Sequence, residues 1–255
     1  MGIRKTALVT GAAKGIGRQI AYCMAEAGYN VIVNYHSNKA AAEELCREME
    51  KFGVRTMTVY ADMGKVSDIE EMYRQVFEVF PVVDVLVNNA GISSEVYFLD
   101  ATEEMFDQMT AIDWKGVYFS SQIAAKKMIE QKVKGTIINL SSNQINGCWP
   151  RATIYAPNKA AISKFTKNAA MELSLYGIRM AAIAPGYTDV GWEPGDIRLK
   201  AAERLPFGRF ATTTEIAKGV VYLASEEAAY ITGTTLVMDG GATLPVVAAN
   251  DFVED

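Results

Sequence analysis

The sequence predicts an α/β protein, built on a parallel sheet of about seven strands with helices on both faces. Seven short runs rich in Val, Ile and Leu alternate along the chain with longer amphipathic stretches. This alternation places parallel strands side by side and lays the connecting helices over both faces of the sheet. The length of 255 residues and the 50% hydrophobic content suit one large domain, 1–255, with ample material for a core.

The runs expected to form strands are, in chain order, Thr6–Thr10, Val31–Tyr35, Arg55–Tyr60, Val83–Val87, Gly135–Leu140, Arg179–Ala184 and Thr234–Met238. The stretches expected to form helices are Gly15–Ala27, Lys39–Phe52, Ser67–Val79, Glu103–Gln131, Ile154–Leu175 and Thr214–Ala224, of which the fourth is long enough to be bent. Right-handed crossovers bring the carboxyl ends of the strands, and therefore the ligand, to one edge of such a sheet. The irregular segment 190–207 is expected to form a flap over that edge.

Composition excludes several classes of protein. The net charge is only −5 and Lys and Arg are scattered, so nothing favours a nucleic-acid or anionic membrane surface. The three cysteines are widely spaced and His36 is the only histidine, which indicates a reducing compartment and neither a disulfide framework nor a metal site. Because no apolar run reaches the ~18 residues of a membrane span, we expect a cytoplasmic protein.

A glycine-rich loop joins the first expected strand to the first expected helix. Gly11 can make the sharp turn, and Gly15 lets the backbone approach a pyrophosphate next to Ile16. Gly17 allows the helix to pack closely on the strand, and the amino end of that helix faces the anion. The loop therefore predicts a Rossmann-type dinucleotide site.

The choice between NAD(H) and NADP(H) depends on the end of the second strand. A site selective for NAD usually has a carboxylate there, about 20 residues beyond the loop, to bind the ribose 2′-hydroxyl. In this chain Tyr35, His36 and Ser37 occupy that place, and Lys14 inside the loop is available to a 2′-phosphate. Charge therefore favours NADP(H), with NAD(H) as the alternative, unless Lys14 is only a solvated loop residue.

Two further strand ends carry polar or small residues. Asp62 and Met63 follow the third strand, where Asp62 can accept a hydrogen bond from the adenine amino group or can simply form a turn. Asn89, Ala90 and Gly91 close the fourth strand. Small and amide side chains are needed where a strand end passes beneath a nicotinamide ribose, although they also suit an ordinary polar turn.

A proton donor is predicted in the second half of the chain. Tyr155 and Lys159 are four residues apart on an expected helix and so share a face. A neighbouring cation favours phenolate, which makes Tyr155 a usable general acid for a ketone or a base for an alcohol. Ser142, at the preceding strand end, can hold the substrate oxygen as a preorganised donor.

Other interpretations of these residues are weaker. The same Tyr-x3-Lys spacing occurs at Tyr35 and Lys39, but there no hydroxyl partner follows a strand end. Ser141 competes with Ser142 and is expected to be a packing or capping hydroxyl. A nucleophilic serine hydrolase is disfavoured, because the single histidine is distant in sequence and no Gly-x-Ser-x-Gly turn occurs.

Together these residues resemble the short-chain dehydrogenase/reductase (SDR) family over nearly the whole chain. The matching segments are, in order, Thr10–Gly17, Asn88–Gly91, Ser142 with Tyr155 and Lys159, Pro185-Gly186, Arg209-Phe210 with Glu215–Ala217, and Thr232-Gly233 with Asp239–Gly241. The resemblance implies hydride transfer between a nicotinamide and a carbonyl carbon. Ser142 would position the oxygen, Tyr155 would exchange its proton, and Lys159 would bind the nicotinamide ribose. It also implies a homotetramer, and in the family a lysine at the place of Lys14 accompanies NADP use.

The chain departs from the family pattern at two positions. Asp113 stands where the family commonly has an asparagine. It could hold a relay water next to Lys159, pair with Lys115, or cap a helix turn. Val190 replaces a threonine of the family, so a contact to the nicotinamide carboxamide is lost or passes to Thr188.

Specificity is expected to come from Ser93–Tyr97, Gln144–Trp149, Tyr187 and the flap with Trp192, because these flank the predicted catalytic residues. Trp149 and Trp192 suggest an apolar wall. The motifs look most like those of 3-oxoacyl-carrier-protein reductases, with sugar or polyol dehydrogenases and hydroxysteroid dehydrogenases as alternatives within the family.

A carrier-protein partner is acidic and would need a basic patch near the entrance. Lys126, Lys127, Lys132 and Lys134 could form one or could be a solvated helix face. The alternative from another class is a non-catalytic dinucleotide-sensing or scaffold protein, motivated by the departures at Asp113 and Val190. The joint presence of Ser142, Tyr155 and Lys159 argues against it.

Overall fold

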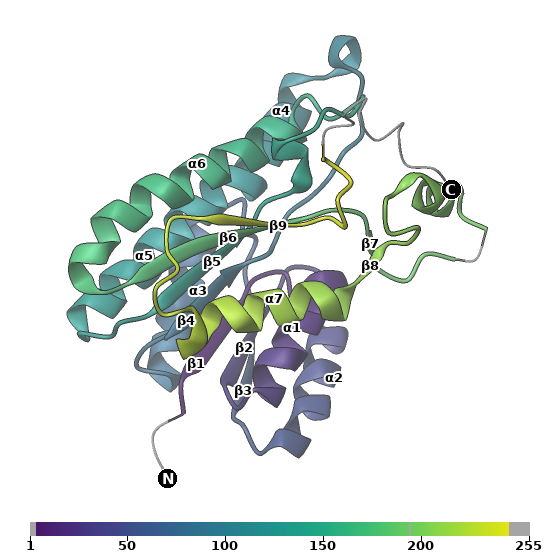
Figure 1. Cartoon of the computed structure of the whole chain (residues 1–255). Coiled ribbons are helices and arrows are strands. Elements are labelled where there is room, and N and C mark those ends of the chain that lie inside the picture. Colours follow the sequence, from purple (N-terminus) through teal and green to yellow (C-terminus); the bar gives the residue numbers. More distant parts are fainter. Residues whose placement is uncertain (1–3, 194, 245–255) are drawn as a thin grey trace.

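The computed structural model describes residues 4–193 and 195–244 and is built on a seven-stranded parallel sheet (Figure 1). The strand order is β3-β2-β1-β4-β5-β6-β9. All strands are parallel, and the chain adds strands first to one side of β1 and then, from β4 on, to the other side. The strands are β1 (Thr6–Val9), β2 (Asn30–Tyr35), β3 (Thr56–Tyr60), β4 (Val85–Asn88), β5 (Thr136–Leu140), β6 (Arg179–Pro185) and β9 (Thr235–Met238). This doubly wound order confirms the predicted Rossmann-type α/β fold.

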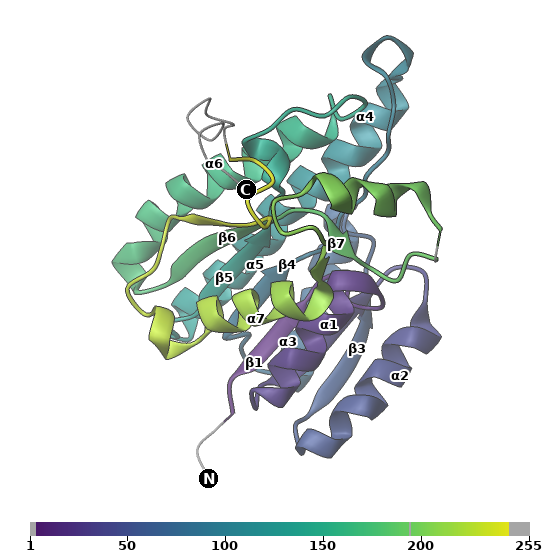
Figure 2. The same ribbon diagram turned by 45° about the vertical axis from the view of Figure 1, so that its right-hand side comes forward.

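Helices cover both faces of the sheet (Figure 2). One face carries α1 (Gly15–Glu26), α2 (Lys39–Met49) and α7 (Thr213–Ala224). The other carries α3 (Val66–Val79), α5 (Val117–Glu130) and α6 (Tyr155–Leu173), with α4 (Glu103–Thr110) packed beside α6. Short 3₁₀ turns at Glu50–Phe52 and Ser174–Tyr176 extend α2 and α6 to the ends expected from the sequence.

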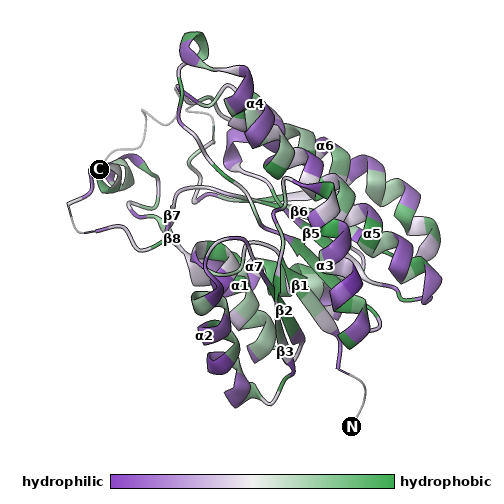
Figure 3. Ribbon diagram, turned by 180° about the vertical axis from the view of Figure 1, so that it is seen from behind, coloured by the Kyte–Doolittle hydropathy of each residue, from purple (hydrophilic) through white to green (hydrophobic). Residues whose placement is uncertain are grey.

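The core has two halves because side chains alternate across the strands. Val9 and Val33 pack with Ile20 on the α1 face, whereas Leu8 and Ile32 lie in the cluster on the opposite face. Figure 3 shows the hydrophobic colour concentrated in the strands and on the inner sides of the helices. Near-continuous apolar strands of this kind are expected of a sheet buried on both sides.

The stretch predicted as one long bent helix, Glu103–Gln131, is helical but changes its pitch midway. Between α4 and α5 lies a π-helical turn, Ala111–Gly116, which contains the buried Asp113. Gly116 lies directly against the Met63 carbonyl oxygen, where a Cβ atom would overlap it. The wide turn thus brings this stretch close to the loop after β3.

The segment 190–207 is bounded by a small two-stranded sheet that the sequence analysis did not predict. β7 (Thr188–Asp189) pairs with β8 (Ala211–Thr212) in parallel, and a 3₁₀ helix spans Ile197–Arg204. Residues 1–3, 194 and 245–255 of the predicted domain lie outside the described residues. No helix of the described part is both long and apolar enough to cross a bilayer.

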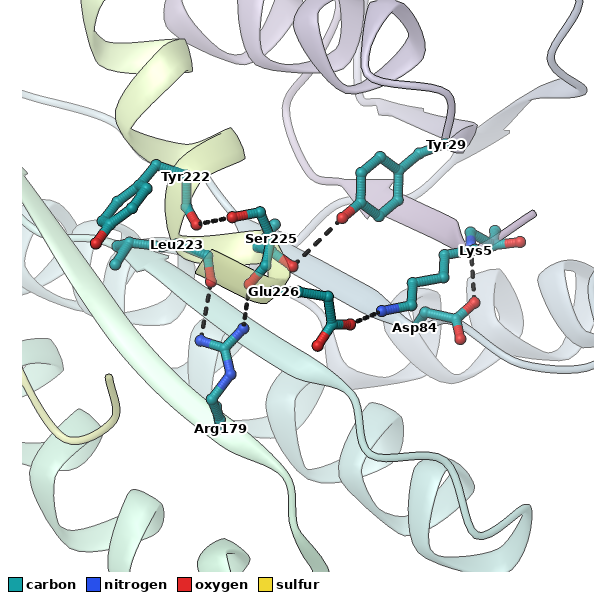
Figure 4. A network of polar contacts seen from close by, with 10 residues as sticks. Lys5, Tyr29, Asp84, Arg179, Tyr222, Leu223, Ser225 and Glu226 are labelled. Atoms are coloured by element: carbon teal, nitrogen blue, oxygen red, sulfur yellow. Dashed lines mark hydrogen bonds and ion pairs between the residues drawn. The ribbon is translucent and has the colours of Figure 1, made fainter. Parts of the chain in front are cut away.

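At the amino end of the sheet, Arg179 holds the end of α7 (Figure 4). Its guanidinium donates to the carbonyl oxygens of Leu223 at 2.9 Å, Ser225 at 3.2 Å and Ile231 at 3.3 Å. Lys5 pairs with Glu226 in the turn that follows. The carbonyl groups that α7 leaves without helical partners are therefore satisfied by a side chain of β6.

Candidate active site

The glycine loop has the shape of a phosphate cradle. Gly11 and Gly15 adopt left-handed backbone conformations, with φ of 62° and 58°. A Cβ atom at Gly17 would overlap the Asn89 amide and lie 2.5 Å from the Gly11 carbonyl oxygen. These positions require glycine, and they leave the amino end of α1 open to a pyrophosphate. The loop therefore fits a dinucleotide.

Two side-chain amides, of which that of Asn34 is buried, hold this loop in place. The Gly11 N–H donates to Asn34 Oδ1 at 3.0 Å, and the Asn89 side chain donates to the Thr10 carbonyl oxygen at 2.8 Å. Thr10 Oγ1 in turn accepts from the backbone N–H groups of Asn89 and Ala90. Sequence reasoning missed the role of Asn34, although a polar residue inside an apolar strand was the signal that could have found it.

The residues predicted to bind the adenosine end lie over β2 and β3. Lys14 is exposed at the start of α1, and His36 and Ser37 are exposed beyond β2. The Tyr35 and His36 rings each lie 6.1 Å from the ring of Tyr60. The Lys14 ammonium and the Ser37 hydroxyl are therefore both accessible at the carboxyl edge of the sheet.

Asp62 uses its side chain locally. Asp62 Oδ1 accepts a hydrogen bond from the Gly64 N–H at 2.9 Å, and the carboxylate lies 3.6 Å from Lys65. This is the turn offered as the alternative to adenine binding. Its neighbour Met63 is buried and contributes the carbonyl oxygen that faces Gly116.

A cavity of about 780 Å³ opens at the carboxyl ends of β4, β5 and β6. It brings together the three predicted catalytic residues, the predicted nicotinamide-side residues and most of the predicted specificity residues. The lining includes Ser142, Tyr155, Lys159, Ile16, Asn89, Gly91, Pro185, Gly186, Thr188, Ser93, Glu95, Gln144, Trp149, Tyr187, Val190 and Trp192.

Tyr155, Lys159 and Ser142 meet on one side of this cavity. Lys159 Nζ lies 5.4 Å from the centroid of the Tyr155 ring and donates to the Leu140 carbonyl oxygen at 3.3 Å. Ser142 Oγ accepts from the Gln144 N–H at 3.3 Å, which leaves its own proton for a substrate oxygen. Ser141 differs, because its hydroxyl donates to the Lys159 carbonyl oxygen at 2.8 Å and so serves the fold.

Asp113 lies behind Lys159 and has no exposed surface. Its Oδ1 accepts from the Ile92 N–H at 2.8 Å. A Cβ atom on Gly91 would be 2.9 Å from Asp113 Oδ1 and 3.2 Å from Lys159 Nζ, so these two atoms are at most about 6 Å apart. Burial raises the pKa of Asp113, and the Lys159 charge partly opposes that rise.

This placement separates the alternatives for Asp113. The second oxygen, Oδ2, is buried without a hydrogen-bond partner among the described residues. Lys115 is exposed, whereas Asp113 faces Gly91 and Lys159, so a pair with Lys115 is not formed. Asp113 therefore lies on the side of Lys159, and its role beside that lysine stays a prediction.

Aromatic side chains form a connected part of the cavity wall. Trp149 Nε1 donates to the Tyr187 hydroxyl at 3.0 Å, and the Tyr187 ring stacks on Phe210 with centroids 5.2 Å apart and an angle of 14°. Trp192 meets Phe210 edge-on, also at 5.2 Å. Trp149, Tyr187 and Trp192 all line the cavity, as the sequence analysis expected of an apolar wall.

The rim of the cavity is closed on one side by a pair of loops. Arg151 pairs with Glu95 at 2.9 Å, and Val96 bridges to Ala152. Arg151 adopts a left-handed conformation, with φ of 63°, and both members of the ion pair line the cavity.

Of the two alternatives for the four lysines, the structure matches the solvated helix face and not a basic patch at the entrance. Lys126 and Lys127 lie in the last turns of α5, and Lys132 and Lys134 precede β5. They therefore gather at the amino end of the sheet, whereas the cavity opens at the carboxyl ends, a strand length of about 16 Å away. Lys127 pairs with Glu130 at 3.0 Å, as on a solvated helix face. The last turns of α5 lie at the amino end of the sheet because α5 runs antiparallel to the strands that it covers.

The fold, the glycine cradle and the Ser-Tyr-Lys cavity together define an oxidoreductase of the short-chain dehydrogenase/reductase family, and the chain belongs to that family. The family model described as "Enoyl-(Acyl carrier protein) reductase" matches residues 11–243. The predictions of the family and of an enzyme of this class are confirmed.

Particular relatives extend over almost the whole chain. The 3-oxoacyl-[acyl-carrier-protein] reductase FabG of Staphylococcus epidermidis is 39% identical over 244 residues, 94% of this chain and 99% of the relative. Glucose 1-dehydrogenase 2 of Bacillus subtilis is 33% identical over 252 residues, which are 94% of this chain and 95% of that protein.

Solved structures agree in fold. Acetoin dehydrogenase from Enterobacter cloacae superposes with a TM-score of 0.90 at 32% identity, covering 97% of this chain and 99% of that one. The angucycline C-6 ketoreductase LanV, solved with bound NADP, has a TM-score of 0.88 at 34% identity and covers 94% of this chain and 96% of its own.

Proposed function

We propose that the protein reduces the ketone of a 3-oxoacyl compound to a secondary alcohol with NADPH, and catalyses the reverse oxidation with NADP⁺. The observation that carries this proposal is the convergence of Ser142, Tyr155 and Lys159 in one cavity beside the glycine cradle. The relative named as a 3-oxoacyl reductase supports the substrate class. The neighbour with bound NADP, together with Lys14 and the missing acid after β2, supports the cofactor.

The cofactor would lie along the carboxyl edge of the sheet. Gly11, Gly15, Ile16 and Gly17 would hold its pyrophosphate, and Lys14 its 2′-phosphate, beside Tyr35, His36 and Ser37. Asp62 and Met63 would flank the adenine. Asn89, Ala90 and Gly91 would lie under the nicotinamide ribose, with Pro185, Gly186 and Thr188 beside the nicotinamide ring. When bound, this cofactor supplies or accepts the hydride.

The chain's own residues handle the oxygen and its proton. Ser142 donates a hydrogen bond to the carbonyl oxygen and stabilises the charge that develops there. Tyr155 gives its phenolic proton to that oxygen as reduction proceeds and takes it back in oxidation. The buried Lys159 ammonium beside the ring stabilises the phenolate that remains. Asp113 positions Lys159 from behind.

The test is the absorbance of NADPH, and then of NADH, while the protein meets β-ketoesters, ketosugars, ketosteroids and diketones. Turnover of a 3-oxoacyl ester with NADPH is the expected result. Tyr155→Phe should lower kcat by at least about 10²-fold while NADPH still binds. Cofactor binding without turnover of any ketone would instead indicate the dinucleotide-sensing alternative, and preference for ketosugars would indicate a sugar dehydrogenase, a class that one relative represents.

The proposal also covers the role of the segment 190–207 and the oligomeric state. The segment 190–207 acts as a flap within a single catalytic domain, because Val190, Trp192 and Ala201 line the cavity from that segment.

The active form is a homotetramer, as the family resemblance implies. Light scattering on the eluting protein tests this statement, and a monomer of 27.9 kDa would contradict it.

A further inference from the structure

The aromatic part of the cavity wall is a connected unit. A chain of contacts runs from Trp149 through Tyr187 and Phe210 to Trp192, by one hydrogen bond and two ring contacts. Its members come from four separate segments: the loop after β5, the loop after β6, the flap and the residue directly before β8. Phe210 is buried at 7% exposure and supports the two residues that it touches.

The orientation of Trp149 is fixed from two sides. Its indole N–H is engaged by the Tyr187 hydroxyl. The far edge of its ring passes over Gly147, where a Cβ atom would lie 2.7 Å from Trp149 Cζ3. An indole held in this way offers a preformed flat surface, because little side-chain freedom remains to be lost when a ligand binds.

The Tyr187 hydroxyl adds a polar point to this surface. Since Trp149 donates to its oxygen, the hydroxyl proton is directed elsewhere, and both residues line the cavity. The wall thus combines flat apolar faces with a donor that can bind a second oxygen, such as the acyl carbonyl of a 3-oxoacyl compound.

The charges around the cavity point to how the substrate arrives. The segment 93–107, which leaves β4 and begins in the lining, has five acidic residues and no Lys or Arg. By sequence, the segments 93–107, 143–153 and 189–206, each of which contributes residues to the cavity lining, contain nine Asp or Glu against four Lys or Arg. Arg151 is the only basic residue of the second segment and is paired with Glu95. An acidic carrier protein would meet repulsion at this rim.

We propose that this cavity selects a free 3-oxoacyl compound with a flat apolar ring next to its reacting ketone, rather than a flexible acyl chain delivered on an acidic carrier protein. The inference rests on the proposed function and names the substrate class of that same site. Flat rings stack on the wall and gain contacts beyond the buried area, whereas a flexible chain loses rotational freedom on the same surface.

The first experiment compares two free esters with the same reacting group. Ethyl benzoylacetate carries a phenyl ring next to the ketone, and ethyl 3-oxohexanoate carries a propyl chain. We expect kcat/KM with NADPH to be about tenfold or more higher for the ring-bearing ester. Equal values, or a preference for the hexanoate, would overturn the inference while leaving the proposed function intact. Failure of both esters together with every other ketone would instead remove the proposed function.

Variants locate the preference in the wall. Trp149→Leu keeps an apolar side chain without the flat ring, and should remove about tenfold of the preference by lowering kcat/KM for ethyl benzoylacetate alone. Trp149→Phe should restore most of it. The matched control is Tyr230→Leu, which removes a fully exposed aromatic residue far from the cavity and should change neither ester. An equal loss for both esters in Trp149→Leu would contradict the assignment; if that variant does not fold, the wild-type ratio and Trp149→Phe decide.

The carrier is tested with one acyl group in two forms. A 3-oxohexanoyl group is presented on acyl carrier protein and on N-acetylcysteamine, a small uncharged thiol. We expect kcat/KM for the carrier-bound form to be no higher than for the free thioester, and to rise with added salt as the repulsion is screened. A carrier-bound form that is tenfold better and loses that advantage in salt would overturn this part of the inference.

Discussion

Replacement of Gly17 by alanine has two opposite effects on the free energy of unfolding: higher helix propensity raises it, and worse packing lowers it. Gly17 lies inside α1, where alanine is favoured over glycine by about 1 kcal/mol. In this structure, however, the new methyl group would overlap the Asn89 amide, which donates to the carbonyl oxygens of Thr10 at 2.8 Å and Gly11 at 3.2 Å. Loss of these two bonds costs about 2 kcal/mol, and the crowding about 1–3 kcal/mol. The net loss of unfolding free energy is therefore about 2–4 kcal/mol.

Urea unfolding followed by circular dichroism measures this loss, and NADPH titration measures its effect on the cradle. We expect the Kd for NADPH to rise by about tenfold or more, since the same bonds hold the loop against β4. The control is a double-mutant cycle with Asn89→Ala, in which the combined loss should be smaller than the sum of the single losses. A Gly17→Ala protein as stable as the wild type, with unchanged NADPH affinity, would refute the reasoning.

Three other perturbations have defined outcomes. Lys14→Ala should weaken NADPH by about 1–2 kcal/mol and NADH hardly at all; equal losses in titration would show that Lys14 does not bind the 2′-phosphate. Burial raises the pKa of Asp113 in the folded state above 3.8, the value of an exposed aspartate. The free energy of unfolding therefore falls as pH rises from 3.8 through the raised pKa, where the buried carboxyl group loses its proton. Asp113→Asn should therefore be more stable than the wild type at pH 7 and equal to it near pH 3.8, and a pH-independent difference in urea midpoints would contradict this. Arg179→Leu leaves carbonyl groups after α7 without donors and should cost about 1–3 kcal/mol of unfolding free energy, whereas an unchanged urea midpoint would show that water replaces the arginine.

The parallel sheet and its number of strands were predictable because each strand is a separate apolar run between clear helix patterns. Prediction was least accurate at strand ends, as in the fourth strand, expected at Val83–Val87 and found at Val85–Asn88. Its last residue is a buried asparagine, which hydrogen-bonds to Asn139 of the neighbouring strand at 2.8 Å. A prediction from apolar runs leaves an asparagine out of the strand, whereas its pairing with the neighbouring strand makes it part of the strand.

The gathering of Ser142, Tyr155 and Lys159 at one cavity was predictable from spacing, since Tyr155 and Lys159 share a helix face and Ser142 ends a strand. The place of the four lysines was not predictable, because proximity in sequence to β5 says nothing about which end of the sheet a residue occupies. The surroundings of Asp113 were not predictable either, because its nearness to Lys159 follows from the packing around Gly91 and not from spacing. For Asn34, a local pattern marks a buried polar residue inside an apolar strand, but it does not say that the partner is the Gly11 N–H.

The π-helical turn at Ala111–Gly116 gives this stretch a tolerance of length that a regular helix lacks. A π-helical turn holds about one residue more than an α-helical turn, so deletion of one residue there would convert it toward a regular turn with little rotation of α4 relative to α5. Thr110 Oγ1 would then keep the hydrogen bond that it accepts from the Asn158 side chain of α6 at 3.3 Å. The same deletion in the middle of α5, where each residue advances the helix by about 100°, would turn one part of the helix away from its neighbours.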